Sequence, residues 1–367
     1  MMTKSDLKQS IKAILRGVCS ASAPLFSKKS QITADQARKT LLACSPCPNG
    51  TTKADNKLLS PSCDLQIIVP AYNVEKYLKA CMDSVLAQKT KYSYHVILVD
   101  DGARDRTPEI CDSYAAHPNV TVIHQKNAGL SGARNTGLKE IFGRYVMFLD
   151  SDDILYPGAI DALLDVAFQH DCDLVEGGAN YVFDDREEAY HCSPTLRLAE
   201  NPFHFHGHAW GKVYKASLFE KLRFPEGFWY EDSLLSFLVF PAVRRAFFCP
   251  QVCYGYRINE SGIVKTSVGK PRAVETYWIT EVLLKEHQNT GLPFDKDFYE
   301  YLLLQARLNQ LRLADLTEEI QEAAFVLLCD LMEQYYPTES NYTGQKNLRN
   351  ALKTRDFGMF KMCCKFF

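Results

Sequence analysis

The stretch YVMFLDSDDIL, residues 145–155, joins an apolar run typical of a buried β-strand to three acidic residues. Asp150, Asp152 and Asp153 stand together here, and crowded carboxylates repel one another unless something holds them in place. One explanation is a helix N-cap at Asp153, with Pro157 in the next turn, although this accounts for only one of the acids. The other explanation is a divalent cation, which takes hard oxygen ligands and offsets the repulsion. The stretch by itself leaves both open.

On either side of this stretch, apolar runs of strand type alternate with amphipathic helical ones. Strands are expected at 65–70, 94–100, 120–125, 145–150 and 172–178, and helices at 75–88, 107–116, 130–142 and 157–169. Such alternation indicates an α/β fold, with an open, mostly parallel sheet covered by helices on both faces. Sheets of this kind bind their ligands in the crevice at the carboxyl ends of the strands.

The first four of these strands are each followed by polar residues. Tyr72 and Asn73 come after the first strand, and Asp100 and Asp101 come after the second. Asn127 follows the third strand, and the acidic triplet follows the fourth. All of them are therefore expected at one rim of the sheet, which indicates a binding site there.

Two common phosphate-binding fingerprints are missing from the sequence. No G-x-G-x-x-G follows the first strand and no G-x-x-x-x-G-K-[ST] is present, so neither a dinucleotide fold nor a P-loop is supported. The first strand ends instead at Pro70, which removes a backbone donor and stiffens the strand exit. In NAGLSGARNTGL, residues 127–138, small residues allow close backbone approach at a helix start, where an anion is favoured. Arg134 adds a fork of donors suited to phosphate.

Length and composition limit the possible classes of protein. A chain of 367 residues that is 46% hydrophobic supports two or three structural units with a sizeable core, and a net charge of −2 gives no reason to expect nucleic acid. Thirteen cysteines without a repeating framework favour free thiols in a reducing compartment. No apolar run is long enough to span a membrane and the N-terminus does not resemble a signal peptide, so we expect a cytoplasmic protein.

Positive charge gathers at the two ends of the chain. Residues 1–60 contain ten Lys/Arg against three Asp, or +7, and residues 341–367 contain six against one, or +5, so the remainder carries −2 − 7 − 5 = −14. A basic amphipathic stripe at 6–18 and the closing stretch 348–367 could each pack on the protein itself. Together they suggest instead a peripheral attachment to the anionic inner surface of a membrane.

The pattern along the chain predicts three segments. Residues 1–62 form a basic extension with a capped helix at 33–44 and a linker at 45–62, residues 63–265 form the α/β domain, and residues 266–367 form a helical region with a basic tail.

Taken together, the motifs resemble those of the inverting nucleotide-sugar glycosyltransferases of family 2, which have the GT-A fold. IIVPAYNVEKYLKACMDSVLAQ, VDDGARDRT, NAGLSGARNTGL and YVMFLDSDD follow that family's order and spacing. AWGKVYKASLF and FWYEDSLLSF resemble the acceptor-side motifs of its bacterial members. The resemblance covers roughly residues 65–262 and departs from the family at Ala103-Arg104, where Ser-Thr is usual. The first 62 residues have no counterpart in a typical member.

The resemblance implies a role for each matching donor-side position. Asp101 would contact the uracil or its ribose. The other positions expected on the nucleotide side are Pro70, Ala71 and Tyr72 around the base, and Asn127 and Arg134. Asp150 and Asp152 would form a D-x-D pair, with Asp152 binding Mg²⁺ or Mn²⁺ directly and Asp150 binding the ribose or a metal-bound water.

On the acceptor side, inverting transfer needs one carboxylate to take the proton of the acceptor hydroxyl. The family pattern assigns this base to Asp232, with Glu231 beside it, although Asp232 could instead cap the helix that follows. Further acceptor or lid residues are expected at His208, Trp210, Lys212, Arg257 and Ser261. The alternating His204, His206 and His208 could bind zinc if they lay in a strand, but we favour a role in lining the acceptor cleft.

The function implied by the resemblance is transfer of a sugar from a UDP-sugar to a hydroxyl of a glycan or lipid-linked acceptor, with inversion. Such a reaction belongs to the synthesis of bacterial cell-envelope polysaccharides. Two alternatives are a nucleotidyltransferase, which would need a Gly-rich loop containing Lys after the first strand, and a non-catalytic binding module. The intact Asp150, Asp152 and Asp232 argue against the second.

Overall fold

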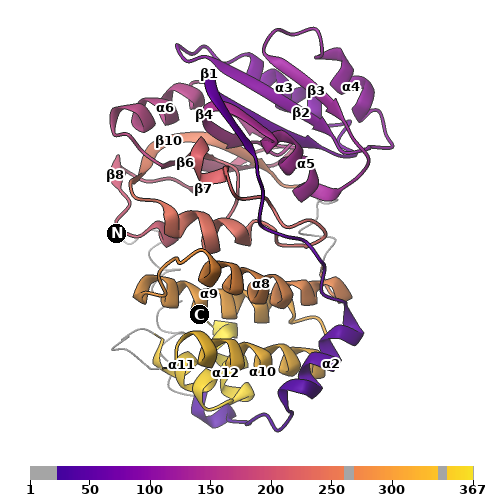
Figure 1. The fold of residues 1–367 in the computed structure, drawn as a ribbon, viewed down its shortest axis with the longest axis vertical. Coiled ribbons are helices and arrows are strands. Elements are labelled where there is room, and N and C mark those ends of the chain that lie inside the picture. Colours follow the sequence, from indigo (N-terminus) through magenta and orange to yellow (C-terminus); the bar gives the residue numbers. More distant parts are fainter. Residues whose placement is uncertain (1–22, 260–267, 338–344, 367) are drawn as a thin grey trace. The chain divides into compact units, whose positions relative to one another are not determined.

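The computed structural model of the chain divides into two compact units, which are shown with their elements in Figure 1. The described residues are 23–259, 268–337 and 345–366. Among them, a sheet unit contains 48–259 and 286–292, and a helical unit contains 23–47, 268–285 and 293–366. This division differs from the three predicted segments, because the N-terminal extension is shared between the two units.

The sheet unit is built on a mixed sheet of ten strands. Eight of them follow the order β3-β2-β1-β4-β9-β6-β10-β5, and the other two pair at its side, β7 with β6 and β8 with β10. The strands are β1 (Lys57–Ala71), β2 (Tyr94–Asp100), β3 (Val120–His124), β4 (Glu140–Phe148), β5 (Ile154–Leu155), β6 (Leu174–Val182), β7 (Glu187–His191), β8 (Arg197–Leu198), β9 (Lys212–Lys215) and β10 (Ala246–Arg257). The long ladders are parallel, as predicted, and the antiparallel ladders are short.

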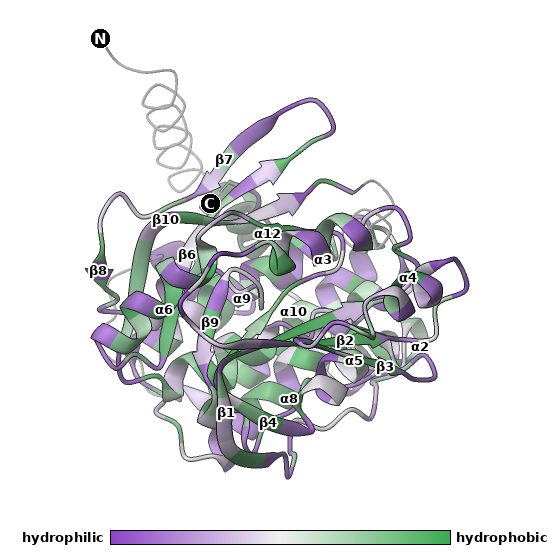
Figure 2. Cartoon of the chain, turned by 90° about the horizontal axis from the view of Figure 1, so that it is seen from above, coloured by the Kyte–Doolittle hydropathy of each residue, from purple (hydrophilic) through white to green (hydrophobic). Residues whose placement is uncertain are grey.

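Helices cover both faces of the parallel part of the sheet. Along β2 the side chains of Val96 and Leu98 enter one apolar cluster, while those of Ile97 and Val99 enter another on the opposite face, as the twofold period of a strand requires. Figure 2 shows β2 as hydrophobic and the turn between β6 and β7 as hydrophilic. The helices of this unit are α3 (Leu78–Leu86), α4 (Thr107–Ser113), α5 (Gly129–Leu138), α6 (Ala159–Gln169), the 3₁₀ turns η2 (Pro202–His204), η3 (Ala216–Phe219) and η5 (Phe240–Ala242), and the π-helical η4 (Leu235–Val239).

Two predicted boundaries are wrong, and they have one cause. β1 begins at Lys57, within the predicted linker, because its first residues pair with the start of β4: Lys57 lies opposite Glu140, and Leu58 lies opposite Ile141. The helix predicted at 130–142 therefore ends at Leu138, since residues 140–142 belong to β4. The buried side chain of Gln66 secures this change of direction by donating hydrogen bonds to the carbonyl oxygens of Gly137 and Glu140.

The helical unit confirms the helical C-terminal region predicted from periodicity. It contains η1 (Ala23–Phe26), α2 (Ala34–Cys44), η6 (Pro271–Val274), most of α8 (Glu275–Asn289), α9 (Lys296–Arg312), α10 (Glu318–Tyr335), α11 (Lys346–Lys353) and α12 (Phe357–Phe366). The N-cap of α2 is Thr33, which forms a capping box with Gln36, so this predicted helix is also present.

The closing stretch of the chain is part of the core of the helical unit. Leu348, Phe357, Phe360 and Cys364 are all buried, and Arg355 is paired with two acids of α10. The apolar residues of the closing stretch therefore pack on the protein itself, which was one of the two alternatives for this stretch; the other was attachment to a membrane. The stripe at 6–18 lies outside the described residues. No helix in the described ranges is long and apolar enough to cross a membrane.

Candidate active site

The ends of β1 and β2 bring the predicted nucleotide-side residues together. The backbone N–H of Asp101 donates to the carbonyl oxygen of Ala71 (2.9 Å), so Asp101 lies beside the exit of β1. The carboxylate of Asp101 is buried and accepts hydrogen bonds from Gln125 (2.7 Å) and from the backbone N–H of Ala128 (2.8 Å). Asn127 donates to the carbonyl oxygen of Asp101 (3.0 Å). These contacts form a rigid corner at the carboxyl edge of the sheet.

Two further predicted residues complete this corner. Pro70 is buried near the end of β1, whereas the side chain of Tyr72, directly after the strand, is 42% exposed. Gly102 turns the chain after Asp101 with a φ of 67°, and a Cβ at this position would lie 2.9 Å from the backbone nitrogen of Asn127. An exposed aromatic ring at the end of this strand is a surface on which a planar base could stack.

The three acids that follow the fourth strand are held by different partners, so their crowding does not require one common ligand. Asp153 is buried and accepts hydrogen bonds from the Tyr254 hydroxyl (2.6 Å) and the backbone N–H of Arg257 (2.7 Å). Asp153 thus fixes the end of β10 and caps no helix, since α6 begins later with Gly158 as its N-cap. The N-cap explanation of the acidic triplet is therefore wrong.

The other two acids border the open edge of the sheet. Asp152 is half-buried, and its carboxylate accepts a hydrogen bond from Asn259 (3.1 Å). The side chain of Asp150 is 24% exposed and is paired with Arg134 (3.0 Å). Tyr254 holds the backbone of Asp150 as well, because its hydroxyl accepts from the Asp150 N–H (3.2 Å).

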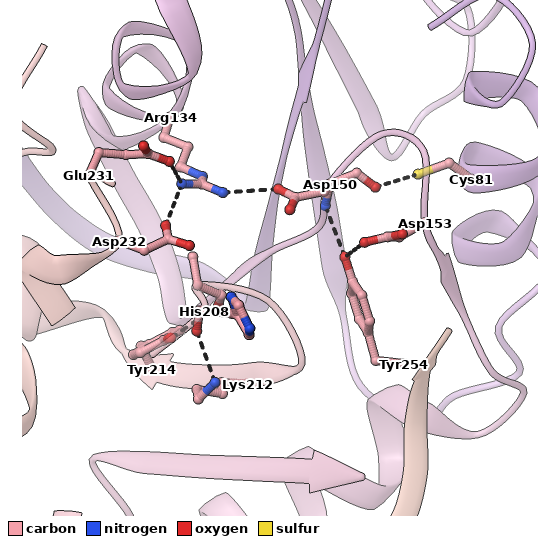
Figure 3. A network of polar contacts seen from close by, with 11 residues as sticks. Cys81, Arg134, Asp150, Asp153, His208, Lys212, Tyr214, Glu231, Asp232 and Tyr254 are labelled. Carbon is pink, nitrogen blue, oxygen red and sulfur yellow. Dashed lines mark hydrogen bonds and ion pairs between the residues drawn. The ribbon is translucent and has the colours of Figure 1, made fainter. Parts of the chain in front are cut away.

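Arg134 connects Asp150 to the two acids predicted at the acceptor side (Figure 3). It lies on α5 with only 1% of its side chain exposed, and besides Asp150 it pairs with Glu231 (2.9 Å) and Asp232 (2.8 Å). Its guanidinium also lies over the ring of Phe224, at 5.2 Å from the centroid. We predicted a phosphate-binding fork, but this guanidinium is buried among carboxylates, so the geometry favours a positioning role.

Burial and crowding change the proton affinity of these carboxyl groups. Burial raises the pKa of Asp150 to about 6, against the lowering effect of the Arg134 charge. Burial, followed by the neighbouring Asp232 charge, raises the pKa of Glu231 to about 7. Three acids therefore share one permanent positive charge, and an additional cation would bind favourably at this place.

Asp232 and Glu231 follow a strained turn. Tyr230 has a φ of 64°, which is unusual for a residue with a bulky side chain and is the kind of outlier that clusters at functional sites. Asp232 directs its carboxylate to Arg134, and 28% of its side chain is exposed. The alternative in which Asp232 serves only as a helix cap is therefore not what the structure shows.

A divalent ion would fit the chemistry of the acids at this edge, with one restriction. Within the described residues, no group of three or more His, Cys, Asp and Glu side chains forms a ready-made metal site. Mg²⁺ and Mn²⁺ are often held by one or two carboxylates together with phosphate oxygens of a substrate. Asp152, with Asp150 beside it, offers such a partial ligand set.

Two residues predicted at the acceptor are placed in the interior instead. Lys212 is fully buried, pairs with Glu176 (2.9 Å) and donates to the carbonyl oxygen of His208 (2.9 Å). Trp210 is also buried, and its ring stacks between those of His208 and Tyr254 at centroid distances of 4.8 and 4.5 Å. A buried ammonium needs an opposite charge and carbonyl oxygens, which explains why Lys212 points inward.

His208, at one end of this stack, is half-buried and lies beside Asp232 in Figure 3. Burial lowers the pKa of His208 to about 4, so its ring is neutral at pH 7. Zinc binding by His204, His206 and His208 was expected only if they lay in one strand. His204 instead ends a 3₁₀ turn, and no strand contains the three histidines.

Arg257, predicted for a lid, is the last residue of β10. Its Nε donates to the carbonyl oxygen of Asp152 (2.9 Å), and its guanidinium lies over the ring of Tyr77. Ser261 lies outside the described residues. Tyr254, Gln125 and the supporting role of Arg257 were missed from the sequence, because each acts on an acid that is distant along the chain.

Comparison with known proteins identifies the domain that this site belongs to. Residues 66–224 match the family model "Glycosyl transferase family 2". The glycosyltransferase GlyA of Streptococcus pneumoniae is 30% identical over 72% of this chain and 43% of its own length. The minor teichoic acid biosynthesis protein GgaB of Bacillus subtilis is 30% identical over 54% of this chain and 23% of its own length. Residues 66–224 therefore form a glycosyltransferase family 2 domain, and the chain spans less than half the length of these two relatives.

A solved structure supports the same fold. S. aureus TarS 1-349, crystallised in complex with UDP-GlcNAc, superposes with a TM-score of 0.62 at 18% sequence identity, covering 82% of this chain and 90% of that one. The predicted GT-A fold, with its helical C-terminal region, is confirmed.

Proposed function

We propose that this enzyme transfers a sugar from a UDP-sugar to a hydroxyl group of a glycan or lipid-linked acceptor, with inversion at the anomeric carbon. The observation that carries the proposal is the position of Arg134, whose guanidinium contacts both Asp150 and Asp232. A donor-side acid and the proposed base are thereby held within one hydrogen-bonded cluster. Inverting transfer needs this proximity, because the acceptor attacks the sugar while the sugar is still bonded to the diphosphate.

Asp232 is assigned as the general base. Its Oδ1 atom is held by Arg134, which leaves Oδ2 as the oxygen that takes the proton from the acceptor hydroxyl. As that proton leaves, the acceptor oxygen bonds to the anomeric carbon and the bond from this carbon to the diphosphate oxygen breaks. The attack is direct, so no covalent enzyme intermediate is required.

The donor half of the proposal rests on the corner formed by Ala71, Asp101 and Asn127. Asp101 would accept from the uracil or its ribose, and Tyr72 would lie against the base. Asp152 and Asp150 would hold Mg²⁺ or Mn²⁺, which when bound neutralises negative charge on the departing diphosphate. The UDP-GlcNAc bound to TarS supports a uridine nucleotide as the carrier.

The acceptor half of the proposal rests on the name of a relative. The name of GgaB refers to teichoic acid synthesis, which supports a cell-envelope polymer or its lipid-linked precursor. An enzyme that extends such a precursor would work at the inner surface of the membrane, where residues 6–18 are the remaining candidate for contact.

UDP release from a panel of UDP-sugars tests the proposal directly. The full-length protein is incubated with each sugar and Mn²⁺ or Mg²⁺, first with water as the only acceptor and then with added glycans. We expect slow UDP release from one or two donors, and inhibition of this release by EDTA. Absence of UDP release and of UDP binding with every donor tested would contradict the proposal.

A further inference from the structure

The chain preceding β1 runs along the segment that leads to the proposed base. We name residues 48–56 the strap. Its backbone pairs with residues 220–223: the N–H of Arg223 donates to Thr52 (2.9 Å), that of Ala54 to Lys221 (3.1 Å), and that of Asn56 to Glu220 (3.1 Å). These contacts continue the sheet-like pairing of an antiparallel bridge between the two segments.

Two strap residues make contacts that depend on their identity. The side-chain amide of Asn56 donates to the carbonyl oxygens of Phe219 (2.7 Å) and Leu222 (2.8 Å), which ties the turn after η3 to the strap. Gly50 packs against the backbone of Pro225 and Glu226 so closely that a Cβ would lie 2.2 Å from the Glu226 oxygen. A side chain at position 50 would therefore displace this backbone.

The segment held by the strap leads directly to the acids. From its other side α5 grips the same segment, because Ser131 donates to the carbonyl oxygen of Pro225 (3.0 Å) and Asn135 exchanges hydrogen bonds with the backbone of Phe224 (2.8 and 2.9 Å). Phe224 in turn places its ring under Arg134. The chain then reaches the strained Tyr230 and, after it, Glu231 and Asp232.

We propose that the strap is a positioning element for the catalytic base, and that Asn56 and Gly50 are positioning residues for Asp232. This inference rests on the proposed function. The base follows a residue in a strained backbone conformation, and such a conformation persists only when the surrounding structure fixes it. The strap and α5 hold residues 219–226 from two sides and so fix where this turn begins. The strap is also the part of the sheet unit that the family resemblance leaves unexplained.

The strap acts mainly through hydrogen bonds at the surface of the unit. A cavity of about 430 Å³ lies between the strap, α5 and the held segment, lined among others by Ala54, Asn135, Arg223 and Glu226. Of the strap residues, Thr52 is buried, while Thr51, Lys53 and Asp55 are exposed. Loosening the strap should therefore move the base without opening the apolar core.

Two variants and one matched control test this role in the full-length chain. Gly50→Ala adds one methyl group against the Glu226 backbone, and Asn56→Asp replaces the donating amide with an oxygen that cannot donate. Asp55→Asn is the control, since it makes the reverse exchange at the adjacent position, where the side chain is 91% exposed and its ion pair with Lys221 is weakened by solvent. The assay is UDP release from UDP-GlcNAc, or from the best donor of the panel, with kcat and KM determined separately.

We expect Gly50→Ala and Asn56→Asp to lower kcat by about 10- to 100-fold, with the KM for the donor within a factor of two, because small misplacements of a catalytic group have effects of this size. Amide hydrogen exchange in residues 224–235 should be faster in both variants than in the wild type. In Asp55→Asn it should match the wild type. Unchanged kcat and exchange would overturn the proposal, as would a lowered melting temperature with an unchanged kcat. If the wild type releases no UDP from any donor, the proposed function fails, whereas the exchange measurement still decides whether the strap holds the base segment.

Discussion

Arg134→Met is the substitution that tests the cluster of acids most directly. It removes the positive charge but keeps an unbranched side chain in a position that is 1% exposed, where the guanidinium lies 2.8–3.0 Å from oxygen atoms of three carboxylates. Removing one partner of a buried ion pair costs about 3–5 kcal/mol, because the remaining charges are left uncompensated. For domains of about 150–250 residues, 1 kcal/mol changes the melting temperature by about 2–4 °C, so we expect a fall of roughly 6–20 °C.

The assay is thermal unfolding followed by tryptophan fluorescence, without divalent metal. Two of the three tryptophans, Trp210 and Trp229, lie in the sheet unit and report on its unfolding. The control is a triple variant that combines Arg134→Met with Asp150→Asn and Glu231→Gln. It should recover part of the lost stability, because removing the opposite charges along with the buried cation is close to neutral. A loss below about 1 kcal/mol for the single variant, or no recovery in the triple variant, would refute the ion-pair explanation.

The other predictions concern the proposed metal ligand, the proposed base, a buried histidine and the N-terminal residues. Asp152→Asn should abolish metal-dependent UDP release while leaving the melting temperature within a few degrees, and release that persists in this variant with EDTA present would exclude the metal assignment. Asp232→Asn should lower kcat by roughly 10²–10⁴-fold with little change in donor affinity, as measured by steady-state kinetics and by calorimetry; a loss of affinity with kcat unchanged would make Glu231 the better candidate. Burial lowers the pKa of His191 to about 3, so between pH 3 and 6.5 the folded state binds fewer protons than the unfolded state. The free energy of unfolding should therefore fall as the pH falls from 6.5 towards 3, and urea titrations should show a shallower fall for His191→Gln. Removal of residues 1–22 should weaken salt-sensitive flotation on anionic liposomes, and equal flotation of both forms would rule out membrane contact by this segment.

Much of the fold was predictable because it depends on patterns of neighbouring residues in the sequence. Strands such as β2 are short apolar runs, the capping box at Thr33 marks the start of α2, and polar residues directly after the strands indicated the edge where the site lies. The parallel order of β1 to β4 follows from the right-handed connection of alternating strands and helices.

What the sequence could not reveal depends on contacts between distant residues. β9 inserts antiparallel between β4 and β6, although a scheme of alternating strands and helices would make those two strands neighbours. Arg134 resembles an exposed helical charge until Glu231 and Asp232, almost a hundred positions later, are brought against it. The burial of Lys212 likewise depends on Glu176, which lies on a different strand.

The strap also has a consequence for the order in which the protein is completed during synthesis. Asn56 leaves the ribosome long before its partners Phe219 and Leu222, which follow it by 163 and 166 positions. At translation rates of about 5–20 residues per second, the strap waits roughly 8–33 s for the segment that it holds. The nucleotide-side corner and the first four strands can form during that interval. Under the proposed function, a nascent chain should therefore become able to bind a nucleotide well before Asp232 is in place. A chain interrupted between these two stages would then bind the donor without transferring the sugar.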